Sequence, residues 1–358
     1  MASSYSPVCS GLSRISTAEL ETALYAHSAF VAHVNGGRRG RFVSRDLANV
    51  DLSNRVLSGA DFTGADLSGA NLRLAEFVET TLYCCDMRRV DGRYANFSHA
   101  DMRGAMLSGS LMTHAKLNYA DFREGRLMRM ANDDQQLIAR SGTADNVNFG
   151  YSSLCGANFE NARLEGANFS GAILHASHFK GAKLANAVFE GAVLEEVDLD
   201  EMDLPSDILK SCILAPTATA KSERSQQIAR LDQHQRWIAT DGRDGRAAVF
   251  DGEDLRPLAD DLSRYKLTAI SAKGVIAVAL DFARLELQGA NFEDADLRGA
   301  NFEGADLRGV RLKNARLGHA KFTGADLRPL QMASGDVMVC DFSGAELAVE
   351  QLEAAIRA

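Results

Sequence analysis

The chain has 358 residues and a formal net charge of −9, and aromatic residues make up 7% of it. This length predicts about two or three domains, and the sparse aromatics indicate a repeat chain rather than an enzyme with a large mixed core. No stretch approaches the roughly 20 apolar residues of a membrane span, and the N-terminus lacks the apolar run of a secretory signal. We therefore expect a soluble cytoplasmic protein.

The N-terminal segment, residues 1–46, is expected to hold a capping helix, because residues 18–34 are amphipathic. It ends in GGRRGR (36–41), which has the glycines of a phosphate-binding loop. The loop lacks the Lys-Ser/Thr pair of a P-loop and the preceding strand of a dinucleotide site. We interpret it as a structural turn between the helix and the segment that follows.

A five-residue period begins at Leu47 and continues to Leu214. Each unit has a large apolar centre, and a small residue stands two positions before it. Neither an α-helix nor a flat strand has this period. The polar stretch 131–146 interrupts it, and the step between the centres on either side, Leu127 and Phe149, is not a multiple of five. Since this step leaves a remainder of two, we expect an inserted loop in a first solenoid spanning 47–214.

The C-terminal part repeats this plan. Residues 215–227 are small and polar and predict a linker. A helix and turn over 228–246 are expected to cap a second solenoid over 247–347, in which the period slips by two positions near Leu262. A short helix is expected over 348–358. Both caps have a histidine three positions before an aromatic side chain, which indicates two related modules: His27 with Phe30, and His234 with Trp237.

A four-sided coil explains why phenylalanine recurs at every fourth unit of the repeat. If each five-residue unit forms one side, the chain returns to the same face after four units, and rings four units apart stack along the axis. The narrow interior accounts for the small residue in each unit, because a larger one would overpack the coil. Asn and Asp beside the centres are expected to bind turn backbone groups. The predicted columns include Phe149, Phe169 and Phe189, and also Phe282, Phe302, Phe322 and Phe342.

The repeats closely resemble the pentapeptide-repeat family, whose consensus is A-(D/N)-(L/F)-x-x. The resemblance is carried by GADFTGADLSGANL (59–72), CGANFENARLEGANFSGAIL (155–174) and GANFEDADLRGANFEGADL (289–307). It implies an all-β solenoid, a right-handed quadrilateral β-helix, here in two modules with short capping α-helices.

No catalytic, cofactor-binding or metal-binding residues emerge from the sequence. The histidines have no ligand spacing with cysteines or carboxylates, so no metal or cofactor is expected. No nucleophile with a base and oxyanion donors is evident, which argues against an enzyme. The outward residues Glu293, Arg298, Glu303 and Arg308 are interpreted as a displayed charge pattern.

The strongest charge feature is EEVDLDEMDLPSD (195–207). Residues 144–214 carry 4 basic and 11 acidic groups, whereas residues 1–143 carry 16 and 15. The acidic stretch is either a solvated face or a docking surface for a basic partner. The residues of this candidate surface are Glu195, Glu196, Asp198, Asp200, Glu201 and Asp203.

The leading functional hypothesis is a non-enzymatic interaction scaffold that presents flat solenoid faces to an unknown protein partner. Direct nucleic-acid binding is not expected, because no basic stripe is evident. The C-terminal end over 348–358 either caps the solenoid or forms a homodimer with its twin. The resemblance also implies an alternative, a DNA mimic that binds DNA gyrase as the quinolone-resistance members do. Export as an effector stays open as well.

Overall fold

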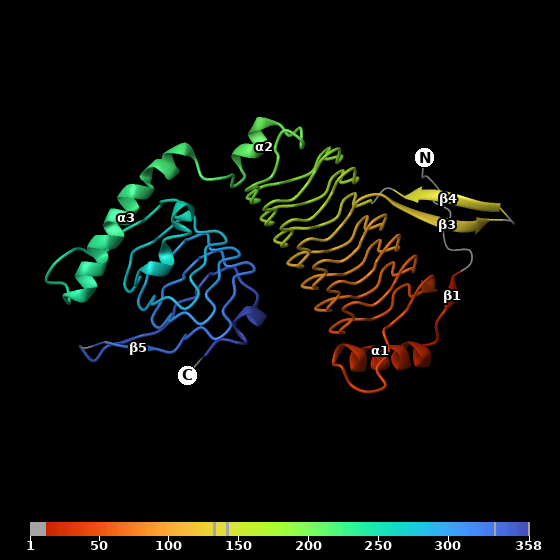
Figure 1. Ribbon diagram of the computed structural model, residues 1–358, viewed down its shortest axis with the longest axis horizontal. Helices are drawn as coiled ribbons and strands as arrows, with labels where there is room; N and C mark the ends of the chain where they lie inside the picture. Colours follow the sequence, from red (N-terminus) through yellow and green to blue (C-terminus); the bar gives the residue numbers. More distant parts are fainter. Residues whose placement is uncertain (1–11, 132–133, 141–142, 333, 357–358) are drawn as a thin grey trace. The chain divides into compact units, whose positions relative to one another are not determined.

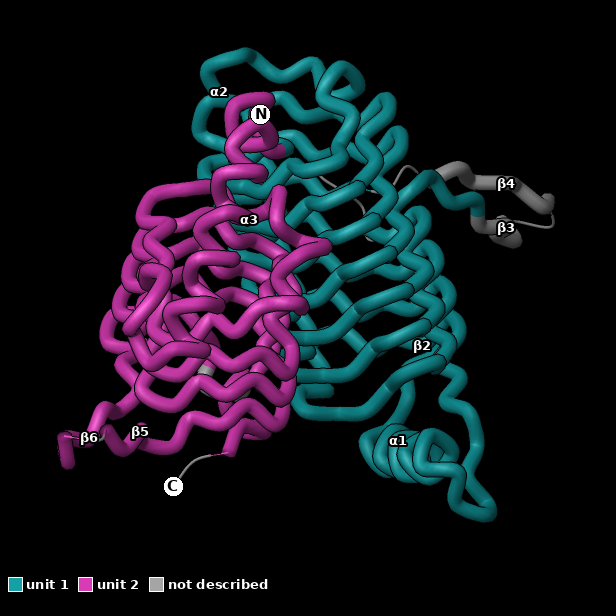
Figure 2. Tube along the Cα trace, turned by 60° about the vertical axis from the view of Figure 1, so that its left-hand side comes forward, with its two compact units in different colours: residues 1–215 teal, residues 216–358 magenta. Residues whose placement is uncertain are grey.

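The structure is a computed structural model that describes residues 12–131, 134–140, 143–332 and 334–356. The chain divides into two compact units, residues 1–215 and 216–358 (Figure 2). Each unit is a solenoid, a stack of short coils with helical or hairpin segments attached (Figure 1). The expectation of an all-β solenoid is confirmed.

The stacking rests on short parallel bridges between positions that are four five-residue units apart in the sequence. Asp51 bridges Asn71, which in turn bridges Asp91. Backbone hydrogen bonds also join neighbouring coils at about this spacing. The N–H of Leu52, for example, donates to the carbonyl of Asn71 at 2.8 Å. The unit centres and the residues two before them turn inward, so the interior is apolar and closed to water. Phe62 and Ala60, for example, are both 0% exposed.

The predicted phenylalanine columns lie inside both units. In the first unit, Phe169 stacks on Phe149 at a centroid distance of 5.2 Å and on Phe189 at 4.9 Å. In the second unit, Phe302 stacks between Phe282 and Phe322 at 5.1 and 5.2 Å. These spacings are close to the roughly 4.8 Å between neighbouring strands, so the ring columns follow the rise of the coils.

Phe342 does not extend its predicted column. Its ring meets that of Phe322 edge to face, at 6.2 Å and an interplanar angle of 72°. Bridges at this point span six units of the sequence instead of four, as between Arg311 and Asp341. The two additional units have left the coil and carry a small hairpin of β5 (Leu330–Gln331) and β6 (Val337–Met338). The prediction for Phe342 was wrong because an insertion of two whole units leaves the five-residue period intact.

A longer insertion interrupts the first unit. Met106 bridges Thr143 across it, whereas on the preceding coil Asp86 bridges Met106. The additional residues form an antiparallel hairpin of β3 (Gly125–Ala131) and β4 (Asp134–Arg140) that projects from the stack (Figure 1). This insertion explains why the step from Leu127 to Phe149 leaves a remainder of two after whole five-residue units. Residues 132–133 and 141–142 of the expected loop lie outside the described residues.

The slip expected near Leu262 is also present. Val249 bridges Ser271 and Asp254 bridges Ile276, so the sequence spacing of each pair exceeds that of a regular coil by two. The two additional positions are taken up by the short 3-10 helices η1 (Arg256–Leu258) and η2 (Leu262–Arg264). Leu262 itself is buried in the core of the second unit, which keeps the slipped segment anchored.

The N-terminal end of the first unit is covered by α1 (Thr17–Val31), which begins with a capping box formed by Ser16 and Glu19. Leu20, Leu24 and His27 are its buried residues. Before the helix, β1 (Ser13–Arg14) pairs in parallel with β2 (Arg45–Asp46). Together they close an edge that would otherwise present unpaired backbone groups to other chains.

The second unit is capped by α3 (Ala218–Ala239). The sequence predicts a linker over 215–227, whereas the helix reaches back to Ala218. Thr217 explains the early start, because its side chain accepts the N–H of Ala220 at 3.1 Å. The residues that follow include the good helix formers Lys, Glu, Arg and Gln. No helix within the described residues is long and apolar enough to cross a bilayer.

Each unit ends in a short helical segment. In the first unit, α2 (Ser206–Lys210) lies within the last coil. In the second, the expected helix over 348–358 is only the 3-10 turn η3 (Val349–Leu352), and Ile356 returns to bridge Asp326. Gln351 joins η3 to the coil below, because its amide donates to the carbonyls of Leu317 and Ala320 at 2.9 and 2.7 Å.

Candidate functional site

The Asp or Asn before each centre has a structural task on the outer faces. Its side-chain oxygen accepts the backbone N–H two positions later, as Asp61 does from Thr63 at 3.0 Å and Asn168 from Ser170 at 2.9 Å. These bonds satisfy donors in the turn that the coil-to-coil ladder leaves unpaired. The interpretation of these residues as turn ties, rather than as catalytic carboxylates, is supported.

A second pattern on the outer faces is a bidentate fork between Asp and the Arg two positions later. Arg Nε donates to one carboxylate oxygen and Nη2 to the other, the geometry of the strongest surface ion pairs. The sequence signal is Asp-x-Arg around a centre, which the sequence analysis missed. Both residues flank an inward centre and therefore lie on one outer face. The eight forks are Asp86–Arg88, Asp91–Arg93, Asp101–Arg103, Asp121–Arg123, Asp254–Arg256, Asp296–Arg298, Asp306–Arg308 and Asp326–Arg328.

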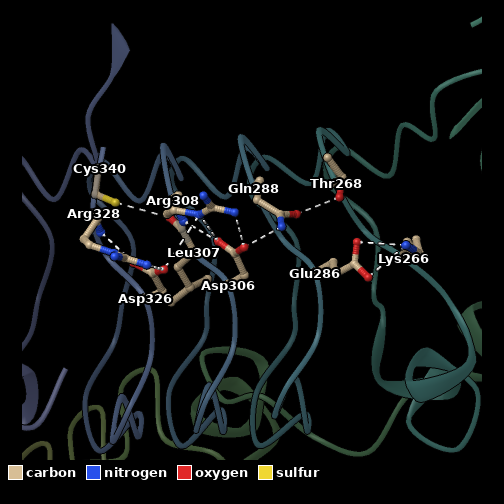
Figure 3. Close-up of polar contacts among 10 residues, drawn as sticks. All are labelled: Lys266, Thr268, Glu286, Gln288, Asp306, Leu307, Arg308, Asp326, Arg328 and Cys340. Atoms are coloured by element: carbon tan, nitrogen blue, oxygen red, sulfur yellow. Dashed lines mark hydrogen bonds and ion pairs between the residues drawn. The ribbon is translucent and has the colours of Figure 1, made fainter. Parts of the chain in front are cut away.

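In the second unit, the forks join into a ladder along one face (Figure 3). Thr268 donates to Gln288 at 2.8 Å, and Gln288 donates to Asp306. The guanidinium of Arg308 forks onto Asp306 and also lies 3.8 Å from Asp326. Hydrogen bonds from Arg328 to Asp326 hold the pKa of that carboxyl below its ordinary value. Asp306 and Asp326 are therefore each paired with arginines of their own face.

This pairing corrects the interpretation of the outward charges in the second unit. Arg298 and Arg308 do not stand out as displayed cations, because both fork onto the preceding aspartate. The prediction that Arg298 faces outward was wrong, because its side chain is buried. Glu293 lies between two lysines, 3.8 Å from Lys273 and 3.9 Å from Lys313. Three of the four residues of the predicted charge pattern therefore have oppositely charged neighbours within the second unit.

The six residues of the acidic surface lie in the final coil of the first unit, between Val193 and its bridge partner Ile213. The apolar side chains between the acids turn inward, and Met202 is buried in the core. Glu196, Asp198, Asp200 and Asp203 are exposed, while Glu195 and Glu201 are half-buried. The structure thus places all six residues together on the outside of one coil.

The acidic surface differs from the forked faces in its pairing. Glu196 lies 3.5 Å from the ring of His175, one coil away. The N–H of Asp200 donates to Asp198 at 3.1 Å. Among the described residues, no Lys or Arg lies within ion-pair distance of Asp198, Asp200 or Asp203. Their charge is available to solvent or to a partner.

Asp145 and Glu165 form a carboxyl pair on another face of the first unit, and the sequence analysis did not predict it. Burial and the neighbouring Glu165 raise the pKa of Asp145 to about 6, while the bond to Asp145 lowers the pKa of Glu165. Arg163 lies 3.4 Å from Asp145 and 3.6 Å from Glu165. The signal was present in the sequence, because the two acids stand four units apart and therefore stack on successive coils.

The two cap histidines are buried with matching hydrogen bonds. His27 and His234 are both 0% exposed. Nδ1 of His27 accepts the N–H of Gly40 at 3.0 Å, and Nδ1 of His234 accepts that of Ala248 at 3.2 Å. Each ring also stacks on the aromatic residue three positions later. Both histidines are therefore packing residues of the caps. Within the described part of the chain, no group of His, Cys, Asp and Glu side chains is arranged to hold a metal ion.

The described geometry is a coil of five-residue units with A-(D/N)-(L/F) on each side. A family model described as pentapeptide repeats matches eight copies that together cover more than half of the chain. This chain belongs to the pentapeptide-repeat family. The matched residues are 46–82, 56–91, 70–109, 93–129, 145–181, 172–205, 281–314 and 290–328.

Several solved pentapeptide-repeat structures are similar to this chain. One is HetL from the cyanobacterium Nostoc sp. strain PCC 7120, a protein involved in heterocyst differentiation regulation. It is 20% identical, with 96% of this chain and 97% of HetL covered and a TM-score of 0.27. A trypsin-treated form of QnrB1, a plasmid-mediated fluoroquinolone resistance protein, is 22% identical, with 53% and 97% covered and a TM-score of 0.28.

A third solved structure, Rfr23 from the cyanobacterium Cyanothece 51142, is 19% identical, with 48% of this chain and 99% of Rfr23 covered and a TM-score of 0.22. No curated protein sequence matches this pentapeptide-repeat chain. Similarity at these identities and TM-scores carries no information about function, which has to be argued from the chain's own surface.

Proposed function

We propose that this protein is a non-enzymatic scaffold for protein–protein interaction in the cytoplasm, with the acidic surface as its docking site for a basic partner. One observation carries the proposal. Asp-Arg forks pair aspartates on the coils of both units, whereas three aspartates close together in the sequence, Asp198, Asp200 and Asp203, have no cationic partner among the described residues. An exposed cluster of uncompensated charge on a rigid support favours fast, salt-sensitive association with an opposite charge.

The architecture that we propose for this scaffold is a right-handed, four-sided β-helix in two modules. Parallel bridges between positions four units apart, together with phenylalanine columns along the axis, support four sides for each coil. Separate caps, each with a buried histidine, support two modules. Rigid flat faces of this kind present side chains at fixed spacing, which suits a docking surface.

The proposal is tested by affinity capture from the native host with identification by mass spectrometry, using the wild type and Asp198→Lys/Asp200→Lys/Asp203→Lys. A matched control reverses two exposed acids elsewhere in the first unit, Glu76→Lys/Glu79→Lys. We expect a basic partner that wild type and control recover, that the acidic-surface variant loses, and that high salt releases. Equal recovery by all three proteins would reject the acidic surface as the docking site.

We also propose that the C-terminal end of the second unit forms a homodimer. Apolar side chains are exposed on the β5–β6 insertion and on the last coil, namely Met332, Val337, Val339 and Ile356, and exposed apolar surface of this kind favours association with a second copy. Light scattering at high protein concentration tests this, with Val337→Asp/Val339→Asp as the variant that should be monomeric. A monomeric wild type would end the dimer proposal and leave the acidic surface untouched.

DNA mimicry is the second candidate, and the excess of acid in residues 144–214 favours it. The forks weaken it, because they remove free negative charge from the faces that a DNA-binding protein would have to contact. The test is DNA gyrase supercoiling with and without quinolone at micromolar protein. Unchanged supercoiling would eliminate this function.

A further inference from the structure

The two caps are built on the same plan, which makes one an internal control for the other. Besides the histidine bonds to Gly40 and Ala248, each cap loop folds back onto its helix in the same way. The N–H of Arg38 donates to the carbonyl of Ala26 at 2.9 Å, and that of Arg246 donates to Gln233 at 3.3 Å. Residues that differ between these matched positions are therefore not required by the cap scaffold.

The differences are concentrated on the outer surface of the first cap. At four matched positions the first cap lacks an acidic side chain of the second cap or has an additional basic one. Tyr25 stands where the second cap has Asp232, and Val43 where it has Asp251; Arg39 stands where it has Ala247, and Arg41 where it has the exposed apolar Val249. Arg38 is matched by Arg246 and is common to both caps.

We define the N-terminal basic patch as Tyr25, Arg38, Arg39, Arg41 and Val43. All five side chains are exposed, and Tyr25 is exposed by 79%. These residues belong to α1, to the loop after it and to the first coil, and α1 lies at one end of the first unit's stack (Figures 1 and 2).

The charges of this patch are poorly compensated. Arg38 has no ion pair within the described part of the chain. Arg39 donates to a carbonyl, that of Gly59, and Arg41 lies 4.0 Å from Asp61 with its side chain 74% exposed. None of the three forms the bidentate fork that arginines of the coils form, as far as the described residues extend. Arg39 and Arg41 each use Nε for these contacts, and their remaining N–H groups, like those of Arg38, can donate to a carboxylate of a partner.

We propose that the N-terminal basic patch is a docking surface for a short acidic protein segment with apolar residues between its carboxylates. Three guanidinium groups supply the charge complement, and Tyr25 and Val43 supply apolar contact area beside them. This surface is separate from the acidic surface in the last coil of the same unit, and it selects the opposite charge.

The size of the patch argues for a short segment rather than an extended polyanion. Nucleic-acid binding at physiological salt rests on several phosphate contacts, on the order of 6–10 for tight binders. Here the basic footprint is three side chains wide, and carboxylates border it. Glu21 lies on α1 and is already bound to Arg55 at 2.8 Å, and Asp61 lies on the next coil. A long phosphate backbone or a flat anionic membrane would extend over these acids, whereas a short segment can contact the three arginines without reaching them.

The test uses the full chain and a fluorescein-labelled peptide DLDEMDL, with NLNQMNL as the uncharged control peptide. Fluorescence anisotropy measures binding to the wild type, to Arg38→Gln/Arg39→Gln/Arg41→Gln and to Tyr25→Asp, which copies the second cap. The matched control, Arg243→Gln/Arg246→Gln, removes two exposed arginines from the second cap. Thermal unfolding of each variant checks that the fold is kept.

We expect the triple variant to weaken binding of DLDEMDL by about tenfold, Tyr25→Asp to weaken it as well, and the control variant to stay within about twofold of wild type. The uncharged peptide should not bind. Equal binding of DLDEMDL by wild type and triple variant would overturn the proposal. So would tighter, arginine-dependent binding of a duplex DNA oligonucleotide or of phosphatidylserine vesicles, measured with the same proteins.

Discussion

His27 and His234 occupy equivalent places in two separate caps, and each uses Nδ1 to accept a backbone N–H from the loop that follows its helix. A ring nitrogen that accepts a hydrogen bond carries no proton, so both imidazoles are neutral with the proton on Nε2. Protonation of Nδ1 would set its N–H against the backbone N–H of Gly40 in the first cap and of Ala248 in the second. Burial lowers the pKa of both histidines, which expresses the same preference for the neutral ring.

The first prediction concerns acid stability. A histidine whose folded pKa lies below its unfolded value, about 6.5, binds its proton more readily in the unfolded chain. Its contribution to stability is complete above that value and is lost as the pH falls from about 6.5 toward the folded pKa. Denaturant unfolding at a series of pH values should show this loss. The double variant His27→Ala/His234→Ala should be less stable than wild type at neutral pH. It should also lose less of its stability as the pH falls. An unchanged pH dependence in the double variant would contradict this account.

The second prediction concerns Asp145, whose effect on stability has the opposite pH dependence to that of the two histidines. Because its folded pKa is raised to about 6, this group favours the folded state below its unfolded value, about 3.9. That contribution is lost as the pH rises through about 6. Asp145→Asn should raise the free energy of unfolding at neutral pH by about 1 kcal/mol, allowing for partial exposure. Asp121→Asn, which breaks a fork, is the contrasting variant and should lower it.

The third prediction tests the ring columns. Phe302 stacks on both sides and is fully buried, so Phe302→Ala should cost about 3–5 kcal/mol. Phe342 is only half-buried and lies outside the column, so Phe342→Ala should cost clearly less. Chemical denaturation monitored by circular dichroism compares the two variants. Equal losses would mean that Phe342 is packed as deeply as the column.

The fourth prediction concerns the forks. Arg308→Ala should lower the free energy of unfolding by about 1 kcal/mol, because it removes bonds to Asp306 and the contact to Asp326. Arg284→Ala is the matched control, since no ion pair of Arg284 is present among the described residues. The difference should shrink at high salt. Arg308→Lys should recover only part of the loss, since an ammonium group cannot form the fork.

Much of the fold follows from the sequence, because the five-residue period determines which side chains point inward. The centres, the small residues beside them and the column from Phe149 to Phe189 all obey this one rule. The same rule predicts Asp and Asn as turn ties. It also predicts an insertion near 131–146, because the step from Leu127 to Phe149 is not a whole number of units.

The period does not reveal features that leave it unchanged. The β5–β6 insertion of two whole units is invisible to it, and so Phe342 was assigned to a column that it does not join. The forks do have a sequence signal, Asp-x-Arg around a centre, but the period of apolar centres does not point to it, because it concerns only the outward residues. The extent of α3 depends on a cap at Thr217, within a stretch whose small polar residues also suit a linker. For the acidic surface, sequence identifies the residues, but whether a Lys or Arg lies beside Asp198, Asp200 and Asp203 depends on the packing around them.

The three insertions, at the β3–β4 hairpin, at η1 and η2, and at the β5–β6 hairpin, differ in length but share a property that bears on protein engineering. In each case the chain resumes the coil in the correct register, so the coils before and after the insertion still pair. This solenoid therefore accepts inserted segments of different lengths, provided that both ends of the segment return to the same point. Epitopes or binding loops could be grafted there at chosen heights along the axis, and their spacing would be set by the rise of the coils.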